Sequence, residues 1–371
     1  PYPTDVRAPY VLTHGISDYF RGERSMDVGS AIRDEVPSTQ PRKGPSILVI
    51  VGESLRPDHA SGFSEYQRDT MPALRSFIAQ HPREAFVFRQ HTPNSAATYW
   101  ALSGLFTGRY PNRTRDEVRS TPTIWQYADA VGYDTFIASS QSWSWGRLKD
   151  LWLQPGPDRF ADADALGLEI LNDTGGDDLT AAEAVRDWLI AGEVKPPFWG
   201  LLQLNSTHWP FVASPNASWP ADDDRALYDA AILRTDEAAG LLLDTLGKSG
   251  LLDDTIVIFT ADHAETLSEH LTPADRADIE EREPGLLHGA RVASCEPAYV
   301  NAPLMVFVPQ KWQAELGIDP AVLAANTARV TSHTDVFATA LTVLGRPVPA
   351  DVDGISLVTA IPDDRIAYCF T

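Results

Sequence analysis

The sequence predicts an α/β fold with a mostly parallel central sheet and helices on both faces. Two observations support this prediction. Short, continuous apolar runs recur along most of the chain, and segments with a helical spacing of apolar residues separate them. Strands that are buried on both faces read as continuous apolar runs, and helical connections between them are typical of parallel sheets. We therefore expect a layered domain over most of the chain.

Strands are expected at residues 47–51, 134–138, 198–204, 255–260 and 303–308. Between the third and fourth of these, a helix fits residues 225–247. An earlier helix is expected to begin at the capping box that Thr180 and Glu183 would form. A further helix is expected after His333. These elements alternate in the order that a doubly covered sheet requires.

The composition is that of a soluble globular protein and limits its partners. The chain has 371 residues, of which 43% are hydrophobic and 22% are charged, and its formal net charge is -21. This charge argues against nucleic-acid binding and against attachment to anionic lipid through a basic surface. No segment approaches the ~20 apolar residues that a membrane-spanning helix needs. Residues 1–45 show no clear period, so we expect a linker or packing arm there and one domain over residues 46–371.

Groups that can bind a metal follow three of the expected strands. Glu53 follows the first strand, His208 follows the third, and Asp262 and His263 follow the fourth. The carboxyl ends of parallel strands meet at one edge of a sheet, where binding sites gather. Two carboxylates and an imidazole without a thiolate suit zinc or manganese better than calcium. We therefore expect a metal site at this edge.

A hydroxyl group beside this metal is expected to be the nucleophile. Ser54 directly follows Glu53, a place typical of a turn or cap residue. In the segment "NSAATYWALSGLFTG", the apolar spacing places Thr98 in the first turn of a helix, whose N-terminus stabilises negative charge. A metal ion beside it would favour the alkoxide. The residues alone leave a second interpretation open, in which Thr98 or Ser95 is simply an N-cap.

These motifs resemble those of the phosphoethanolamine transferases that modify lipid A and lipopolysaccharide core, a family of the alkaline phosphatase and sulfatase superfamily. The segment "VIVGESLRPDHASGFSEYQRDTMPAL" is similar to the family's first signature, and "NSAATYWALSGLFTG" is similar to its nucleophile segment. "LNSTHWP", "TADHAET" and "SHTDVFATALTVLG" resemble later segments, although Ala264 and Thr266 replace the usual glycine and serine. The similarity extends over residues 46–357.

The resemblance implies which residues carry the chemistry. It aligns Thr98 with the family's phosphorylated threonine and implies one tightly bound zinc ion, with manganese as the alternative. The implied ligands are Glu53, Thr98, Asp262 and His263. His208 and His288 are implied around the incoming phosphate, as proton donors or as ligands of a second ion. Asn94 and Ser95 are expected beside the substrate.

The resemblance also implies a transferase that works in two steps. Thr98 would attack the phosphodiester of phosphatidylethanolamine, release diacylglycerol, and pass phosphoethanolamine to a glycan or lipid acceptor of the cell envelope. Family members carry transmembrane helices ahead of the catalytic domain and act at the periplasmic face of the inner membrane. We therefore expect a membrane segment that precedes Pro1 and is missing from this chain.

Other functions stay open on the sequence alone. A phosphoglycerol transferase of the lipoteichoic acid or periplasmic glucan type shares the Glu, Thr and Asp-His arrangement, and a phosphodiesterase or phosphatase-like hydrolase would use the same intermediate. A binding module would keep the scaffold without the chemistry. The sequence argues against a sulfatase, which needs a C/S-x-P-x-R motif, because the nearest approach, "CEPAY" from Cys295, lacks the arginine. Family members also carry several disulfides, whereas Cys295 and Cys369 permit one at most.

Overall fold

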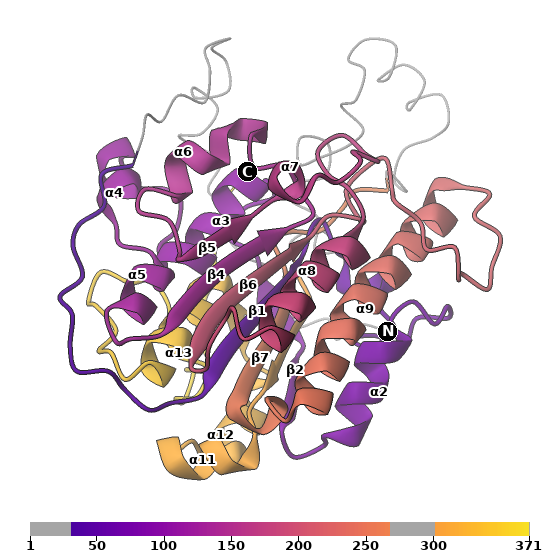
Figure 1. Cartoon of the computed structure of the whole chain (residues 1–371). Helices are drawn as coiled ribbons and strands as arrows, with labels where there is room; N and C mark the ends of the chain where they lie inside the picture. Colours follow the sequence, from indigo (N-terminus) through magenta and orange to yellow (C-terminus); the bar gives the residue numbers. More distant parts are fainter. Residues whose placement is uncertain (1–30, 268–300, 371) are drawn as a thin grey trace.

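The protein has a central sheet that helices cover on both faces (Figure 1). The structure is a computed structural model that describes residues 31–267 and 301–370. Within these residues the sheet has seven strands in the order β2-β8-β7-β1-β6-β4-β5. They are β1 (Ser46–Gly52), β2 (Ala85–Phe88), β4 (Asp134–Ser139), β5 (Arg159–Ala161), β6 (Phe198–Leu204), β7 (Thr255–Ala261) and β8 (Leu304–Phe307). Only β8 runs against the others in this sheet, because it pairs antiparallel with both β2 and β7. The predicted α/β class with a mostly parallel sheet is therefore confirmed.

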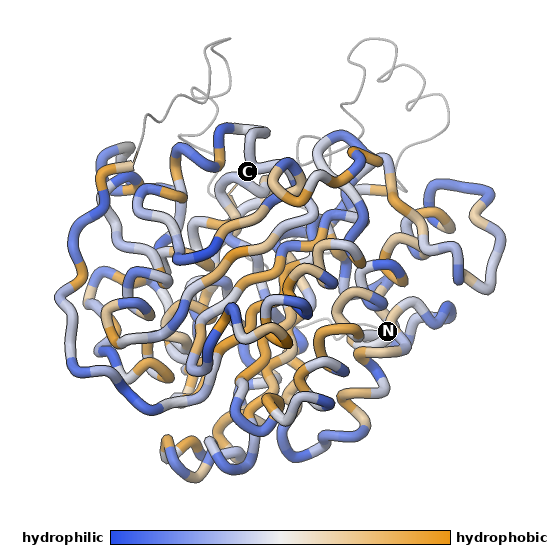
Figure 2. Tube along the Cα trace, in the orientation of Figure 1, coloured by the Kyte–Doolittle hydropathy of each residue, from blue (hydrophilic) through white to orange (hydrophobic). Residues whose placement is uncertain are grey.

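Two helical layers bury the two faces of β1. One layer consists of α2 (Pro72–Gln80), α8 (Asp178–Ile190) and α9 (Asp224–Ser249), and the other consists of α3 (Thr98–Thr107), α5 (Ile124–Asp129), α6 (Leu148–Trp152) and α13 (His333–Val343). Ile47, Val49 and Val51 pack into the α3 and α13 core, whereas Leu48 and Ile50 pack into the α8 and α9 core. Each such buried side chain contributes about 1.5–3 kcal/mol to folding. Figure 2 shows hydrophobic residues both along the central strands and on the helices that cover them.

The remaining elements are short. The helices are α4 (Arg115–Ser120), α7 (Ala163–Leu166), α11 (Gln310–Leu316) and α12 (Pro320–Asn326), with 3-10 turns at η1 (Pro57–His59), η2 (Trp145–Arg147) and η3 (Leu252–Asp254). A separate parallel sheet joins β3 (Gln90–Thr92) to β9 (Val330–Ser332). This small sheet positions the site, because β3 leads into α3, β9 leads into α13, and the two helices pack against each other.

The structure corrects the predicted elements in two respects. Each predicted strand is present, but β2, β3, β5 and β9 were not predicted, because three or four residues are too few to show a period. The predicted capping box at Thr180 is wrong. The helix begins at Asp178, and its N-cap is Asp177, whose side chain accepts a hydrogen bond from the Thr180 backbone N–H. An aspartate caps a helix as well as a threonine does, and the sequence offers both here.

The stretch from residue 31 to residue 45 runs along α4, α5 and α6. Its main anchor is Arg33, whose guanidinium donates to the backbone carbonyls of Val118, Thr121 and Leu151. The boundary between an N-terminal arm and a domain at residue 46 stays a prediction. Cys369 is buried, and because Cys295 lies outside the described residues a disulfide between them also stays a prediction. In the described part of the chain, no helix has both the length and the apolar character that crossing a bilayer requires.

Candidate metal and nucleophile site

The register of the three central strands brings their ends to one place. β1 lies between β6 and β7, and Gly52 is the register partner of both Leu204 and Ala261. Two backbone hydrogen bonds extend this alignment by one residue. Glu53 N donates to Leu204 O at 2.7 Å, and Asp262 N donates to Gly52 O at 3.1 Å. Glu53 and Asp262 therefore leave the sheet side by side at its carboxyl edge.

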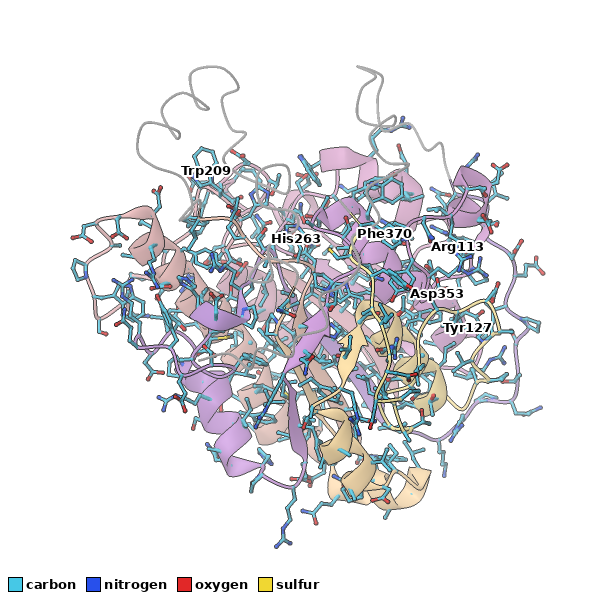
Figure 3. The ribbon with its side chains drawn as sticks, turned by 180° about the vertical axis from the view of Figure 1, so that it is seen from behind. Arg113, Tyr127, Trp209, His263, Asp353 and Phe370 are labelled. Atoms are coloured by element: carbon cyan, nitrogen blue, oxygen red, sulfur yellow. The ribbon has the colours of Figure 1, made fainter. Side chains whose placement is uncertain are left out.

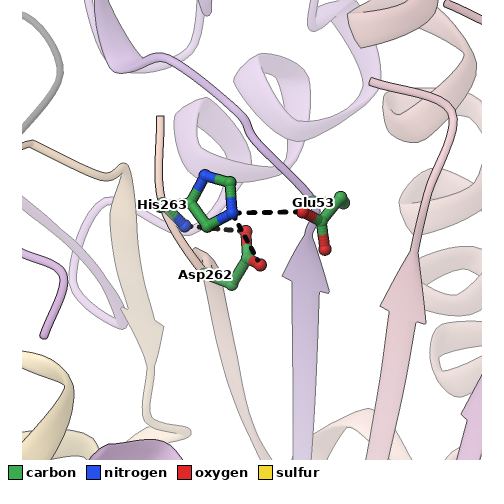
Figure 4. Close-up of side chains that lie close together, drawn as sticks. All are labelled: Glu53, Asp262 and His263. Atoms are coloured by element: carbon green, nitrogen blue, oxygen red, sulfur yellow. Dashed lines mark hydrogen bonds and ion pairs between the residues drawn. The ribbon is translucent and has the colours of Figure 1, made fainter. Parts of the chain in front are cut away.

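Asp262 and His263 reach the same point because the chain turns after β7. In a continuing strand their side chains would point to opposite faces. Here Asp262 Oδ1 accepts hydrogen bonds from the backbone N–H groups of His263, at 2.7 Å, and Ser54, at 2.9 Å. His263 Nε2 lies 3.2 Å from Glu53 Oε1 and 3.4 Å from Asp262 Oδ2 (Figure 4). Across residues 31–267 and 301–370, this is the one group of metal-binding side chains whose ligand atoms all lie within 4.8 Å of one another.

Thr98 is the first residue of α3, and its hydroxyl faces this group. Thr98 Oγ1 donates to Glu53 Oε1 at 2.8 Å and lies 3.2 Å from His263 Nε2. The N-cap of α3 is Ala97, which makes no side-chain cap, so the interpretation of Thr98 or Ser95 as an N-cap is wrong. Because a helix N-terminus favours negative charge, it stabilises charge that develops on the Thr98 oxygen.

Ser54 lies in a strained turn beside these residues. Its φ of 52° falls in the left-handed region, which residues other than glycine seldom adopt. Tyr228 of α9 fixes the turn, because its hydroxyl donates to Ser54 O at 2.7 Å and accepts from Arg56 N at 2.8 Å. Ser54 Oγ in turn donates to Glu53 Oε1 at 3.3 Å and lies 3.4 Å from His263 Nδ1. The strained turn therefore belongs to the site.

Burial and mutual charge shift the pKa values of all three candidate ligands. Burial alone would raise the pKa of Glu53, but hydrogen bonding and charge from His263, with the charge of His208, hold it below its ordinary value. Burial and the neighbouring Glu53 carboxylate raise the pKa of Asp262 well above its ordinary value. Burial opposes a charged His263, yet the carboxylates of Asp262 and Glu53 raise the pKa of His263 to about 10. The two carboxylates thus attract positive charge to this point.

A divalent cation fits this arrangement. Asp262 Oδ2 is buried and accepts no hydrogen bond from the residues that the structure describes. Two adjacent buried carboxylates carry negative charge that a cation would neutralise. The donor atoms that would hold the ion are Glu53 Oε1, Thr98 Oγ1, Asp262 Oδ2 and His263 Nε2. A set of two carboxylates, an imidazole and a hydroxyl suits zinc or manganese.

His208 lies at the same edge, in the loop that follows β6. The hydroxyl of Thr207 donates to the backbone carbonyl of Glu53, which ties this loop to the end of β1. His208 is buried, and its Nδ1 lies 2.7 Å from Trp209 O. Viewed from behind, Trp209 and His263 lie toward the same end of the molecule (Figure 3). A role for His208 at the phosphate stays a prediction.

The other predicted substrate residues are Asn94 and Ser95, which precede α3, and His288. The Asn94 side chain fills the space that a Cβ at Gly104 would need, and Asn94 O accepts a hydrogen bond from Phe370 N at 2.8 Å. Ser95 Oγ accepts a hydrogen bond from Ala97 N at 3.2 Å. Contacts of Asn94 and Ser95 with a substrate stay predictions. His288 lies outside the described residues, so its role at the phosphate stays a prediction.

Sequence reasoning missed two residues that support the site. Gln203 of β6 donates from Nε2 to Glu53 Oε2 at 3.3 Å, and Tyr228 fixes the Ser54 turn. A signal for Gln203 was present, because it is the polar residue in the otherwise apolar run "FWGLLQL", and a buried amide needs partners. Tyr228 gave no such signal, since a tyrosine inside an amphipathic helix is ordinarily a core residue.

Comparison with known proteins identifies sulfatase relatives. A family model described as Sulfatase matches residues 45–346. Arylsulfatase K from Bos taurus is 30% identical over 134 residues, which are 36% of this chain. This match covers 20% of the length of arylsulfatase K.

Solved structures show the same fold at low sequence identity. The periplasmic domain of phosphoethanolamine transferase EptC from Campylobacter jejuni has a TM-score of 0.62 at 13% identity, covering 88% of this chain and 100% of that one. Lipoteichoic acid synthase LtaP from Listeria monocytogenes has a TM-score of 0.61 at 17% identity, covering 85% of this chain and 76% of that one. The periplasmic domain of Escherichia coli EptC in complex with zinc has a TM-score of 0.59 at 15% identity, covering 85% of this chain and 86% of that one. Because the Sulfatase model spans most of the residues, the chain belongs to the sulfatase family, and its fold is that of the alkaline phosphatase superfamily.

Proposed function

We propose that this protein is a metal-dependent transferase that moves phosphoethanolamine from a phospholipid to a glycan or lipid acceptor through a phosphorylated Thr98. The observation that carries the proposal is the place of the Thr98 hydroxyl. It lies at the N-terminus of α3, 2.8 Å from Glu53 Oε1 and 3.2 Å from His263 Nε2. A hydroxyl is a weak nucleophile unless neighbouring groups orient it and stabilise its anion, and these groups do both.

The proposed reaction has two steps at one phosphorus atom. In the first step a bond forms between Thr98 Oγ1 and phosphorus, the bond to the diacylglycerol oxygen breaks, and diacylglycerol leaves as the alcohol with the proton from Thr98. In the second step the acceptor hydroxyl forms a bond to phosphorus, and Thr98 recovers a proton as its own bond breaks. When bound, the metal ion supplies Lewis-acid stabilisation of the negative oxygens.

The side chains have separate roles in this scheme. Glu53 orients the nucleophile, because its Oε1 accepts the hydrogen bond from Thr98 Oγ1. The N-terminus of α3 stabilises the charge on the threonine oxygen. We assign His208 and His288 to the phosphate, where an imidazole binds the phosphoryl oxygens or protonates the leaving alkoxide.

The nucleophile segment favours phosphoryl transfer over hydrolysis of sulfate esters. A sulfatase of the family needs a C/S-x-P-x-R motif at its nucleophile. In this chain residues 98–102 are Thr-Tyr-Trp-Ala-Leu, which have neither the proline nor the arginine. The threonine hydroxyl thus supports a phosphorylated residue as the intermediate.

The donor, the metal and the place of action are parts of the same proposal. Zinc is the proposed ion and manganese the alternative, and the zinc complex of the Escherichia coli domain supports zinc. Phosphatidylethanolamine is the proposed donor. The similar domains from Campylobacter jejuni and Escherichia coli are periplasmic, which supports action at the periplasmic face of the inner membrane.

A phosphoglycerol transferase is the second candidate. The similarity in fold to lipoteichoic acid synthase LtaP supports a phosphoglycerol transferase. The similarity to the EptC domain supports a phosphoethanolamine transferase about equally. Both reactions use the same nucleophile and the same metal. They differ in the alcohol that stays on the phosphorus, which is ethanolamine in one and glycerol in the other.

The intact mass of the protein tests these candidates. The zinc-loaded protein is incubated with micelles of phosphatidylethanolamine or of phosphatidylglycerol, and both the protein mass and the released diacylglycerol are measured. We expect the mass of one phosphoethanolamine group on the wild-type protein and none on Thr98→Ala. An adduct of glycerol phosphate would favour the second candidate instead. Turnover of either lipid without any acceptor indicates a hydrolase, and neither adduct nor turnover refutes the proposed function.

A further inference from the structure

A chain of buried hydrogen bonds reaches Glu53 through its second carboxylate oxygen. Gln203 of β6 donates from Nε2 to Glu53 Oε2 at 3.3 Å and also to Gln141 Oε1. Gln203 Oε1 accepts from Trp143 Nε1 at 2.7 Å and from Ser139 Oγ at 3.0 Å. None of these five side chains is exposed to solvent. The network is therefore shielded from water. In such surroundings each hydrogen bond is strong, and the loss of one is costly.

Trp143 fixes which way the Gln203 amide points. The indole N–H of a tryptophan can only donate a hydrogen bond, so the atom of Gln203 beside it must be the carbonyl oxygen. The hydroxyl of Ser139 binds the same oxygen. The amide nitrogen of Gln203 therefore faces Glu53, and one of its N–H groups donates a hydrogen bond to Glu53 Oε2.

The two oxygens of Glu53 consequently have different surroundings. Oε1 accepts from Thr98 Oγ1 at 2.8 Å and lies 3.2 Å from His263 Nε2. Oε2 faces Gln203, on the side of β6. Rotation of the carboxylate away from this orientation would break the hydrogen bond to Gln203.

We propose that Gln203 is a positioning residue that holds Glu53 so that only Oε1 is presented to the metal ion. Groups that hydrogen-bond to a metal ligand orient it, and their loss typically costs about 10- to 100-fold in metal affinity. The inference rests on the metal site of the proposed function, but it holds for any donor lipid. Gln203 is not among the candidate metal ligands, so we expect it to act through Glu53.

Zinc affinity of the full chain tests this role, and it is measured by competition with a chelating dye after EDTA treatment. Gln203→Met keeps the length of the side chain and removes both its donor and its acceptor. Gln203→Glu keeps the acceptor for Trp143 and Ser139 and replaces the donor that faces Glu53 by a carboxylate oxygen, which repels Glu53 instead of holding it. The matched control is Gln313→Met. Gln313 is also buried, and its Nε2 donates to the carbonyls of Arg83 and Val308, but it lies in α11 (Figure 1).

We expect both Gln203 variants to bind zinc about 10- to 100-fold more weakly than the wild-type protein. Gln313→Met should bind zinc as the wild type does. This should hold even if the melting temperature of its metal-free form falls as far as that of the Gln203 variants. Wild-type affinity in either folded Gln203 variant would overturn the inference while leaving the proposed function intact. If Gln203→Met does not fold, Gln203→Glu decides alone. A wild-type protein that binds no zinc would overturn both the inference and the proposed function.

Discussion

The individual side chains of the site favour binding of a cation over stability of the metal-free protein. Glu53 and Asp262 bring two carboxylates together without exposure to water, which costs free energy when no cation is bound. His263 offsets part of this cost, because its Nε2 lies close to a carboxylate oxygen of each. Local conflicts of this kind are typical of functional sites. Substitutions at single residues should therefore separate stability from activity.

Replacement of Thr98 by valine should remove the chemistry and leave the scaffold in place. Valine has the shape of threonine without the hydroxyl, so it cannot form the bond to phosphorus. We expect lipid turnover to fall by about three orders of magnitude or more. Thr98→Ser keeps a hydroxyl and should still form the adduct, which mass spectrometry measures. A valine variant that still forms an adduct would show that another residue, such as Ser54, is the nucleophile.

Asp262→Asn should weaken zinc binding and stabilise the metal-free protein. The amide removes one of two adjacent buried charges, and its oxygen can still accept from the N–H groups of Ser54 and His263. We expect the free energy of unfolding in EDTA to rise, because burial and the Glu53 carboxylate raise the pKa of Asp262 in the folded state and so oppose its ionisation there. Denaturant unfolding with EDTA and with zinc measures both effects.

A second buried aspartate provides the contrast for this prediction. Both oxygens of Asp178 accept hydrogen bonds, among them one from Ser140 Oγ at 2.6 Å and one from Thr235 Oγ1 at 2.9 Å. Asp178→Asn replaces an acceptor by a donor, so it should destabilise the protein by about 1–3 kcal/mol. If Asp262→Asn destabilises the metal-free protein as much as Asp178→Asn does, repulsion between Glu53 and Asp262 is not the dominant effect.

The secondary-structure elements supply the site from their ends. β1 and β7 deliver their ligands where the strands finish, and α3 delivers Thr98 where the helix begins. The long helix α9 contributes from its second turn, through Tyr228, which is wholly buried. The turn after β1 therefore depends on a helix that is remote in sequence, since 174 positions separate Tyr228 from Ser54.

Tyr228→Phe should loosen this turn without removing any ligand. The change leaves Ser54 O and Arg56 N without the tyrosine hydroxyl, and unpaired buried polar groups cost about 1–3 kcal/mol each. Because Ser54 has a φ of 52°, the released turn should relax toward a more common conformation. We expect a lower free energy of unfolding, measured in denaturant, and a zinc affinity that is also reduced.

Tyr133→Phe is the matched control for the loss of a buried hydroxyl. Tyr133 is also buried, but its hydroxyl makes no hydrogen bond with the described residues. Removing it should leave stability unchanged or increase it, and zinc affinity should stay at the wild-type value. Equal losses in the two variants would mean that the size of the side chain, and not the Tyr228 hydrogen bonds, explains the effect.

Across the whole molecule, the sequence predicted those features that continuous local patterns encode. The five long apolar runs became strands because each is buried on both faces. Glu53, Asp262 and His263 could be predicted because each directly follows such a run, and parallel strands end at one edge. Thr98 needed more than its local pattern, since helical spacing alone also allowed an N-cap, and the resemblance to a family decided between the two.

The supporting contacts could not be predicted, because they join residues that are far apart in sequence. The hydrogen bond from Gln203 to Glu53 connects positions 150 residues apart. No local period encodes such a pair, and its formation depends on which strands become neighbours. Strand order in turn is decided by packing of the whole sheet, as the antiparallel insertion of β8 between β2 and β7 illustrates. The short strands escaped prediction for a different reason, since three or four residues are too few to show a period.

His333 joins three parts of the molecule and should make its stability sensitive to acid. It begins α13, its Nε2 donates to the carbonyl of Ala261 on β7 at 2.9 Å, and its Nδ1 lies 3.3 Å from the carbonyl of Ala101 on α3. Its ring centroid lies 5.2 Å from that of His91 on β3. Burial, together with the charge of His263, lowers the pKa of His333 to about 4. The folded protein therefore keeps this imidazole neutral.

The sign of the pH effect follows from proton uptake by the unfolded chain. There the pKa of a histidine is about 6.5, so between pH 6.5 and 4 the unfolded state binds a proton that the folded state does not. The free energy of unfolding should fall as the pH falls through this window, by about 2 kcal/mol between pH 7.5 and 5 from this residue. His333→Gln keeps a donor for Ala261 and cannot titrate, so its stability in EDTA should depend less on pH by that amount. Denaturant unfolding at the two pH values measures the difference, and parallel losses in both proteins would show that His333 does not contribute to it.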